Sequence, residues 1–299
     1  MPKSAKGRVT FKEVQLAARP YSKSASAIAT ASATATASVA NVEPTVAELS
    51  QFHTIIFTIA RMNPPTLGHM KVVNALIEKA IELGERTVYV LLQAGDKAGK
   101  ETKNPLECEE KKLYLEKMIL SKNKSDVNVI VLCADDDKLL AYPGKRAPLS
   151  QVWYIYDLEK ENIEEGKTPF FYLMVGTDRV SEFSSFIKPK YLPLNSPSYV
   201  KDIPRPKTVL TGNPDQDAAA GISGTKLREL AKKGERDEFM RLELAAGLSP
   251  RTASKLYEDL NERMRTLPDT YTKKGGKRRS NKRKTKRRSR RKIIRRKSY

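Results

Sequence analysis

The chain is poor in cysteine and lacks a long apolar run. Its two cysteines, Cys108 and Cys133, lie 25 residues apart and form no C-x-x-C pair. This spacing argues against a zinc site and a disulfide-stapled scaffold, and it favours a reducing compartment. The longest uncharged stretch, residues 24–42, consists mostly of Ala, Ser and Thr. Such a stretch is too weakly apolar to insert into a membrane.

Acidic residues are scarce at both ends of the chain. Residues 273–299 hold 17 Lys or Arg and no acid, and residues 1–42 hold six Lys or Arg and one acid. Residues 43–272 hold 33 basic and 34 acidic residues, a net charge of −1, so the overall +21 lies in the ends. This distribution excludes a uniformly basic nucleic-acid-binding domain as the main interpretation. The near-neutral middle is long enough for one large α/β domain.

The two ends have the composition of disordered segments. Residues 1–50 form a basic leader rich in Ala, Ser and Thr, and its low-complexity part, residues 22–42, has nothing large to bury. We interpret it as a flexible leader, with an organelle transit peptide as the alternative. The Lys/Arg-rich tail, residues 272–299, is typical of a segment that binds nucleic-acid phosphates without base specificity, or of a nuclear address.

Strand and helix patterns alternate through the middle. Two Leu/Met/Val/Ile patterns with helical spacing cover residues 66–83 and 105–120, and we expect the second helix to begin after an Asn104 cap. The alternation predicts a doubly wound, parallel, five-stranded Rossmann-like sheet. The expected strands are Ile55–Ile59, Thr87–Leu92, Val127–Leu132, Phe170–Val175 and Thr208–Thr211, and the further helices cover 149–163, 179–187, 223–233, 235–246 and 249–266.

We therefore expect an α/β domain over residues 51–234 and a helical appendage over residues 235–271. In a sheet of this kind the ligand lies at the carboxyl ends of the strands, where the strand order reverses. We therefore expect ligand-binding and catalytic residues in the turns that follow the strands.

The turn after the first expected strand is suited to an anion. Two prolines stiffen it, and Thr66 can cap the helix that follows. Gly68 leaves room for a close approach, and His69 falls in the first helical turn. The backbone N–H groups and the dipole at such a helix start favour negative charge.

A second helix start after the last expected strand has a similar chemistry. Ser223, Thr225 and Arg228 lie at or in the first turn of this helix. Two hydroxyls and a guanidinium at a positive helix end suit the outer phosphates of a nucleoside triphosphate. Taken alone, each turn is also explained by ordinary helix capping.

Weaker signals accompany the two turns. Gly176, Asp178 and Arg179 follow the fourth strand, where an acid and backbone groups can meet a base or a ribose, although Asp178 also suits a plain helix cap. Lys97 or Lys103 in the loop after the second strand could reach a phosphate. The acidic run 135–137 could hold Mg²⁺, but a solvated loop is the favoured interpretation.

The two turns together resemble the signatures of HxGH-superfamily nucleotidyltransferases, which include cytidylyltransferases and nicotinamide-mononucleotide adenylyltransferases. T-x-G-H follows the first strand, and I-S-G-T-x-x-R resembles the motif I-S-S-T-x-x-R. The runs RMNPPTLGH, TKNPLECEEKKLYLEKM, VGTDRVSEF and GISGTKLRELAKKGERDEF resemble a narrower group from large bacteriophages and giant DNA viruses. The sequence departs from the superfamily pattern at Ala60, Met62 and Gly224, where Gly, Phe and Ser are usual.

The resemblance implies transfer of AMP or CMP from an NTP to a phosphorylated small molecule, with Mg²⁺ accompanying the nucleotide. It implies that the catalytic residues are His69, Thr66, Arg228 and Lys103. It implies that the nucleotide-binding residues are Arg61, Asn63, Gly68, Gly176, Asp178, Arg179, Ser223, Gly224 and Thr225.

Other interpretations remain open. One is a non-catalytic protein, associated with nucleic acid or a virion, that retains the fold. Another is a relative of class I aminoacyl-tRNA synthetases, although the chain is short and lacks a K-M-S-K-S-like run. We expect an intracellular location, in the host cytoplasm or a virus factory or virion if the chain is viral, with the basic tail allowing a nuclear one.

Overall fold

A computed structural model describes residues 42–93, 97–134, 136–143, 148–185, 187–204 and 223–270. These residues all belong to one of two compact units, Asn41–Tyr299. The expected fifth strand, Thr208–Thr211, lies outside the described residues, as do the basic tail from residue 271 and most of the leader.

Five parallel strands form a single sheet in the order β3-β2-β1-β4-β5. The strand order therefore reverses between β1 and β4, which are direct neighbours. This topology confirms the doubly wound α/β fold that the alternating pattern predicts. The strands are β1 (Phe52–Ala60), β2 (Thr87–Leu92), β3 (Asn128–Cys133), β4 (Thr168–Gly176) and β5 (Ser198–Ile203).

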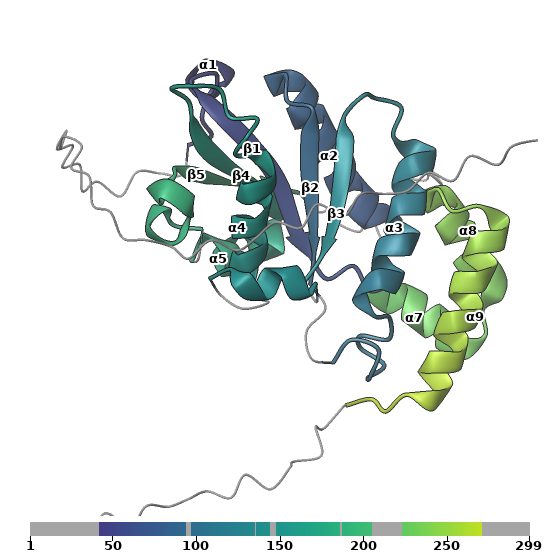
Figure 1. Ribbon diagram of the computed structural model, residues 1–299. Coiled ribbons are helices and arrows are strands. Elements are labelled where there is room, and N and C mark those ends of the chain that lie inside the picture. The colour runs from purple at the N-terminus through teal and green to yellow at the C-terminus, as the bar shows by residue number, and fades with distance from the viewer. Residues whose placement is uncertain are drawn as a thin grey trace, which may run out of the picture. The chain divides into compact units, whose positions relative to one another are not determined.

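Helices cover both faces of the sheet (Figure 1). On one face α2 (Leu67–Leu83) and α3 (Cys108–Lys122) pack on the strands. The C-terminal helices α7 (Gly224–Lys233), α8 (Arg236–Ala246) and α9 (Pro250–Thr266) join that layer. The opposite face carries α4 (Pro148–Glu159) and α5 (Val180–Ser184). Short elements complete the fold: α1 (Val46–Leu49), η1 (Asp137–Ala141), η2 (Thr177–Arg179), η3 (Pro189–Tyr191) and η4 (Pro193–Asn195).

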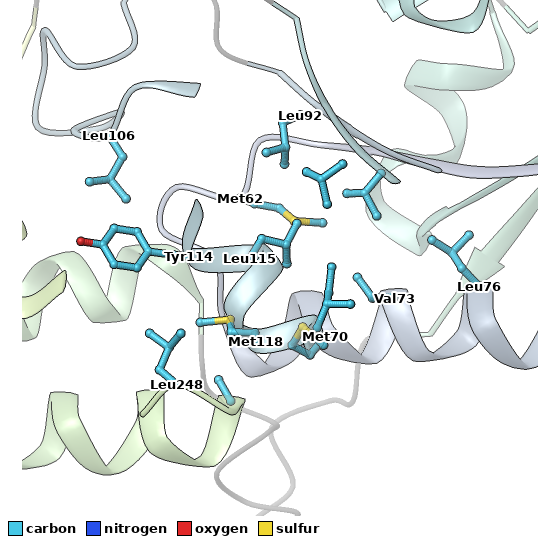
Figure 2. Close-up of a cluster of buried hydrophobic side chains, with 14 of the residues drawn as sticks. Met62, Met70, Val73, Leu76, Leu92, Leu106, Tyr114, Leu115, Met118 and Leu248 are labelled. Carbon is cyan, nitrogen blue, oxygen red and sulfur yellow. The ribbon is translucent and has the colours of Figure 1, made fainter. Parts of the chain in front are cut away.

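Two apolar layers, one on each face of the sheet, form the core. The β1 residues alternate between the layers, with Ile56 facing α2 and α3 while Ile55 and Phe57 face α4. Figure 2 shows part of the larger layer, where Met62 and Leu92 lie near Leu115 of α3 and Met70 of α2. Because both faces are covered, the strands consist of nearly continuous apolar runs.

The helix boundaries follow local capping chemistry in several places. Thr66 caps α2, and Gly84, with φ of 73°, ends it. Ser223 caps α7, and Ser249 caps α9 just before Pro250. All four positions agree with the helix starts and stops expected from the sequence.

Other boundaries differ from the expectation. The fifth strand is Ser198–Ile203, a segment that the sequence analysis did not select. Helix α3 begins at Cys108, four residues after the expected cap, with a capping box between Glu107 and Glu110. Asn104 does not cap it, because its side-chain oxygen accepts a hydrogen bond from the Asn63 amide. Helices α4 and α5 are also shorter than the expected 149–163 and 179–187.

The first and last described segments are both held to the domain. Glu43 accepts hydrogen bonds from Tyr172 and Lys201 and pairs with Lys79 at 3.3 Å. Burial raises the pKa of Glu43, but the hydrogen bonds from Lys201, Tyr172 and Lys79 outweigh it and lower the pKa to about 2. At the other end, the Thr102 N–H donates to the Pro268 carbonyl at 3.0 Å.

No helix among the described residues is both long enough and apolar enough to span a membrane.

Candidate functional site

A cavity of about 300 Å³ lies at the carboxyl edge of the sheet, where the strand order reverses. Residues from the ends of β1 and β4 line it, together with Gln93 after β2 and Ile203 of β5. The start of α2 and the start of α7 complete the wall. A cavity in this place is the usual ligand site of a doubly wound sheet.

The turn after β1 presents a histidine that its neighbour orients. The Thr66 hydroxyl lies 2.9 Å from Nδ1 of His69 and accepts the His69 backbone N–H at 3.4 Å. Thr66 itself is buried, whereas His69 is partly exposed and lines the cavity. The same hydroxyl therefore caps the helix and holds the imidazole ring.

The start of α7 packs directly on the turn after β1. Arg228 donates from one guanidinium nitrogen to the Asn63 carbonyl at 2.5 Å and from the other to the Thr225 hydroxyl at 3.0 Å. A Cβ on Gly224 would lie 2.9 Å from that same carbonyl oxygen. The glycine that replaces the usual serine thus allows the two turns to approach closely.

Positive charge collects around the cavity. Arg61 and Lys71 both line it, both are exposed, and neither forms an ion pair with a described residue. Burial, and then the charge of Arg61, lower the pKa of Arg228 below its usual value. The wall is therefore electropositive without a described acidic residue in it, which suits an anionic ligand.

Another part of the lining is more apolar. It contains Val175 and Gly176 at the end of β4, Phe183 of α5, and Ile203 with Pro204 after β5. Arg179 also lines the cavity and pairs with Glu182 of the same segment. A cavity lined by both apolar and basic residues suits a ligand that has a ring and phosphates.

The structure brings most of the expected site residues to this cavity. Arg61, Thr66, Gly68, His69, Gly176, Arg179, Ser223 and Gly224 all line it. Arg228 and Thr225 are connected to it through the Asn63 carbonyl and each other.

Five expected residues do not line the cavity: Arg228 and Thr225, which are connected to it as described, and three others. Asn63 is buried, and its amide group bonds to both the N–H and the carbonyl of Leu106, so it holds the loop before α3. Asp178 and Lys103 are exposed. Lys97, the other lysine of the loop, pairs with Glu101 at 3.3 Å.

Several lining residues were not expected from the sequence. Lys71 and Val72 extend the α2 wall one turn beyond Gly68 and His69, a helical spacing that could have indicated them. Gln93 follows β2 directly, which was a second available signal. No sequence signal indicated Phe183 and Ile203, because they reach the cavity through the packing of α5 and β5.

Within the described part of the chain, no group of three His, Cys, Asp or Glu side chains is arranged to hold a metal ion. Asp136 instead caps the turn at Lys138 with a 2.9 Å hydrogen bond. Asp135 lies outside the described residues.

Comparison with solved structures finds adenylyltransferases of low sequence identity. One is assigned as a nicotinate-nucleotide adenylyltransferase from Vibrio parahaemolyticus, with 16% identity, TM-score 0.41, and coverage of 69% of this chain and 99% of that one. A bifunctional NMN adenylyltransferase/ADP-ribose pyrophosphatase from Francisella tularensis gives 13% identity, TM-score 0.44, and coverage of 71% and 53%. The same enzyme with AMP and a manganese ion gives 14% identity and a TM-score of 0.43, with coverage of 71% of this chain and 52% of that one. This chain thus spans about half the length of the bifunctional enzyme.

A search of curated protein sequences gave no match. A family model gave one: the cytidylyltransferase-like model matches residues 57–230, which run from the middle of β1 to the first turns of α7 and include both turns of the cavity. The matched part is more than half of the chain, and the chain therefore belongs to the cytidylyltransferase-like family.

Proposed function

We propose that this protein is a nucleotidyltransferase of the HxGH type, which transfers AMP or CMP from an NTP to a phosphorylated small molecule. An oxygen of the acceptor phosphate attacks the α-phosphorus of the NTP. The bond from the α-phosphorus to the bridging oxygen breaks, and pyrophosphate leaves. The acceptor oxygen is already an anion near neutral pH, so positioning and charge stabilisation carry the catalysis.

One observation carries this proposal: the two motif turns, about 150 residues apart in the sequence, form one wall of one cavity. Their contact through Arg228, Gly224 and the Asn63 carbonyl fixes their relative positions. Family membership independently supports nucleotidyl transfer in general.

Thr66 and His69 act on the reacting phosphate in this mechanism. The Thr66 hydroxyl accepts the His69 N–H, which leaves its own proton free to donate to Nδ1. A neutral His69 then carries its proton on Nε2 and donates a hydrogen bond to a phosphate oxygen. Charge that develops on that oxygen during transfer strengthens this bond, which is the condition for catalysis.

The departing pyrophosphate belongs at the start of α7 and beside Arg61 and Lys71. Ser223 and the N-terminus of α7 face the cavity, and Arg61 and Lys71 supply positive charge to it. The base of the nucleotide belongs at the apolar wall near Phe183 and Ile203. This orientation places opposite ends of the NTP against walls of matching chemistry.

The described residues lining the cavity include no carboxylate that could hold Mg²⁺. We therefore expect the ion to enter bound to the triphosphate oxygens, where it neutralises part of their charge.

A screen for pyrophosphate release tests the proposal. ATP, CTP, GTP and UTP are each paired with nicotinamide mononucleotide, phosphopantetheine, phosphocholine, glycerol phosphate and sugar phosphates. We expect release with ATP or CTP and one class of acceptor. A grid without release, from protein that is folded by circular dichroism, would contradict transfer to these acceptors.

The basic run of residues 273–299 favours a second candidate, a non-catalytic nucleic-acid-associated protein. Seventeen Lys or Arg without an acid bind phosphates in a salt-dependent way. Calorimetry with ATP or CTP, compared with DNA binding at two salt concentrations, distinguishes the candidates, because the second predicts DNA binding and no nucleotide binding.

A further inference from the structure

We propose that Lys111, which does not line the cavity, is a positioning residue for it. Its buried ammonium group holds the carbonyl of Gln93 and so fixes the edge of the cavity at the end of β2. The inference rests on the proposed nucleotidyl transfer, because it assigns Lys111 a part in that reaction.

A short chain of hydrogen bonds connects Lys111 to the cavity. Lys111 Nζ donates to the Gln93 carbonyl at 2.6 Å. The N–H of Gln93 donates in turn to the Ala60 carbonyl at 2.9 Å. Gln93 and Ala60 both line the cavity. The turn after β1, which holds Thr66 and His69, starts directly after Ala60. The ammonium group therefore acts on the cavity through two backbone groups of a single residue.

Two neutral side chains hold the preceding residue, Leu92, in a similar way. The Cys108 thiol lies 3.7 Å from the Leu92 carbonyl, and the Gln151 amide lies 3.4 Å from it. These weaker contacts lie on the β2 side of Gln93. Among these three side chains, Lys111 makes the shortest hydrogen bond, and it holds the residue that lines the cavity.

Packing alone does not explain a lysine at this position. Its side chain is 0% exposed, and burying a charge costs free energy that an apolar residue of similar length would not. Lys111 also lies in the first part of α3, near the helix end where a cation is unfavourable. Glu109 and Glu110 in the first turn offset part of that cost.

The test uses the full chain with Lys111→Met, which keeps the side-chain length and removes the donor. Lys117→Met, on the exposed side of the same helix, is the matched control. We expect Lys111→Met to lower kcat/KM by ten- to hundredfold, with most of the loss in kcat, because displaced reacting groups lose alignment. The control should remain within twofold of the wild type.

An unchanged kcat/KM in Lys111→Met would overturn the proposal.

Hydrogen exchange of the Gln93 amide gives a readout that does not need activity. We expect faster exchange in Lys111→Met than in the wild type and the control, because the Gln93–Ala60 bond opens more often. If the wild type releases no pyrophosphate, the proposed function fails while this comparison still decides the role of Lys111. Unchanged exchange overturns the positioning role.

Discussion

At the scale of single residues, the cavity depends on side chains with two tasks each. The Thr66 hydroxyl caps α2 and holds the His69 ring at 2.9 Å. The simpler explanation of these residues as helix caps and their proposed catalytic roles are therefore compatible. Replacing His69 should separate the two tasks, because it removes the ring and leaves the Thr66 cap in place.

We predict that His69→Ala lowers turnover by about 10²-fold or more, by analogy with the loss of a transition-state hydrogen-bond donor. The backbone N–H that Thr66 caps remains, so α2 should stay folded. Pyrophosphate release by the variant and by Lys117→Met is the measurement. A near-wild-type rate for His69→Ala would show that another group acts on the reacting phosphate.

We predict that Gly224→Ser lowers activity, although it restores the residue usual in the superfamily motif. The new Cβ would lie 2.9 Å from the Asn63 carbonyl oxygen and 3.3 Å from that of Pro64. Forcing the two turns apart should cost about 1–3 kcal/mol of stability and weaken nucleotide binding. Thermal unfolding and calorimetry, with Lys232→Ser on the exposed side of α7 as the control, measure both effects. Equal or tighter nucleotide binding by Gly224→Ser would count against the close approach.

Much of the cavity was predictable from the sequence because motif turns are local. Thr66, Gly68 and His69 follow from a helix start after β1, Ser223 and Gly224 follow from the helix start of α7, and all five line the cavity. Asn63 was selected as a nucleotide-binding residue, yet its amide holds Leu106. That contact joins segments 43 residues apart, and no local pattern indicates it.

At the scale of elements, the four apolar strands were predictable and the charged strand β5 was not. The four strands β1 to β4 are apolar runs, as covered parallel strands are. Strands β3 and β5 both lie at an edge of the sheet, but only β5 interrupts its apolar run with charged residues, Lys201 and Asp202. The start of α3 was also not predictable from local sequence. The Asn104 side chain accepts a hydrogen bond from Asn63 and does not cap the helix.

The start of β1 and the end of α4 are joined by a titratable contact. His53 Nε2 lies 3.2 Å from a Glu159 carboxylate oxygen that also accepts from Asn162. The hydrogen bond to Glu159 raises the pKa of His53, while burial opposes it. Burial raises the pKa of Glu159, but the bonds from His53, Tyr89 and Asn162 bring it below its usual value.

We predict that this contact stabilises the fold more at pH 5.5 than at pH 8.5. His53 has a raised folded pKa, so its contribution is complete below the unfolded value of 6.5 and disappears as pH rises through the folded value. Glu159 stays ionised at pH 5.5. The free energy of unfolding of the wild type minus that of His53→Gln should be larger at pH 5.5, on the order of 1 kcal/mol. Urea unfolding at both pH values measures it, and a pH-independent difference would exclude the charged pair.

At the scale of the whole molecule, the net positive charge and the candidate site lie in different parts of the chain. The segment 43–272 has a net charge of −1, and its cavity is electropositive through a few placed cations. The excess of +21 lies in the two ends. Local charge at the cavity does not require a positively charged domain.

We predict that removing residues 273–299 leaves pyrophosphate release within about twofold of the full chain. The same deletion should abolish salt-sensitive nucleic-acid binding, because it removes 17 cations. Filter binding at two salt concentrations and the release assay, on the same preparations, measure both. A truncated protein that is folded but inactive would show that the tail takes part in catalysis.

The contacts of Glu43 also define how much of the leader the domain can lose. Glu43 joins β4, β5 and α2 through Tyr172, Lys201 and Lys79. A protease that trims the leader up to residue 42 leaves these contacts in place, whereas a cut two residues further on separates the carboxylate from the fold. Residue 43 is thus where the contacts that hold the N-terminal segment to the sheet and to α2 begin, within the described residues.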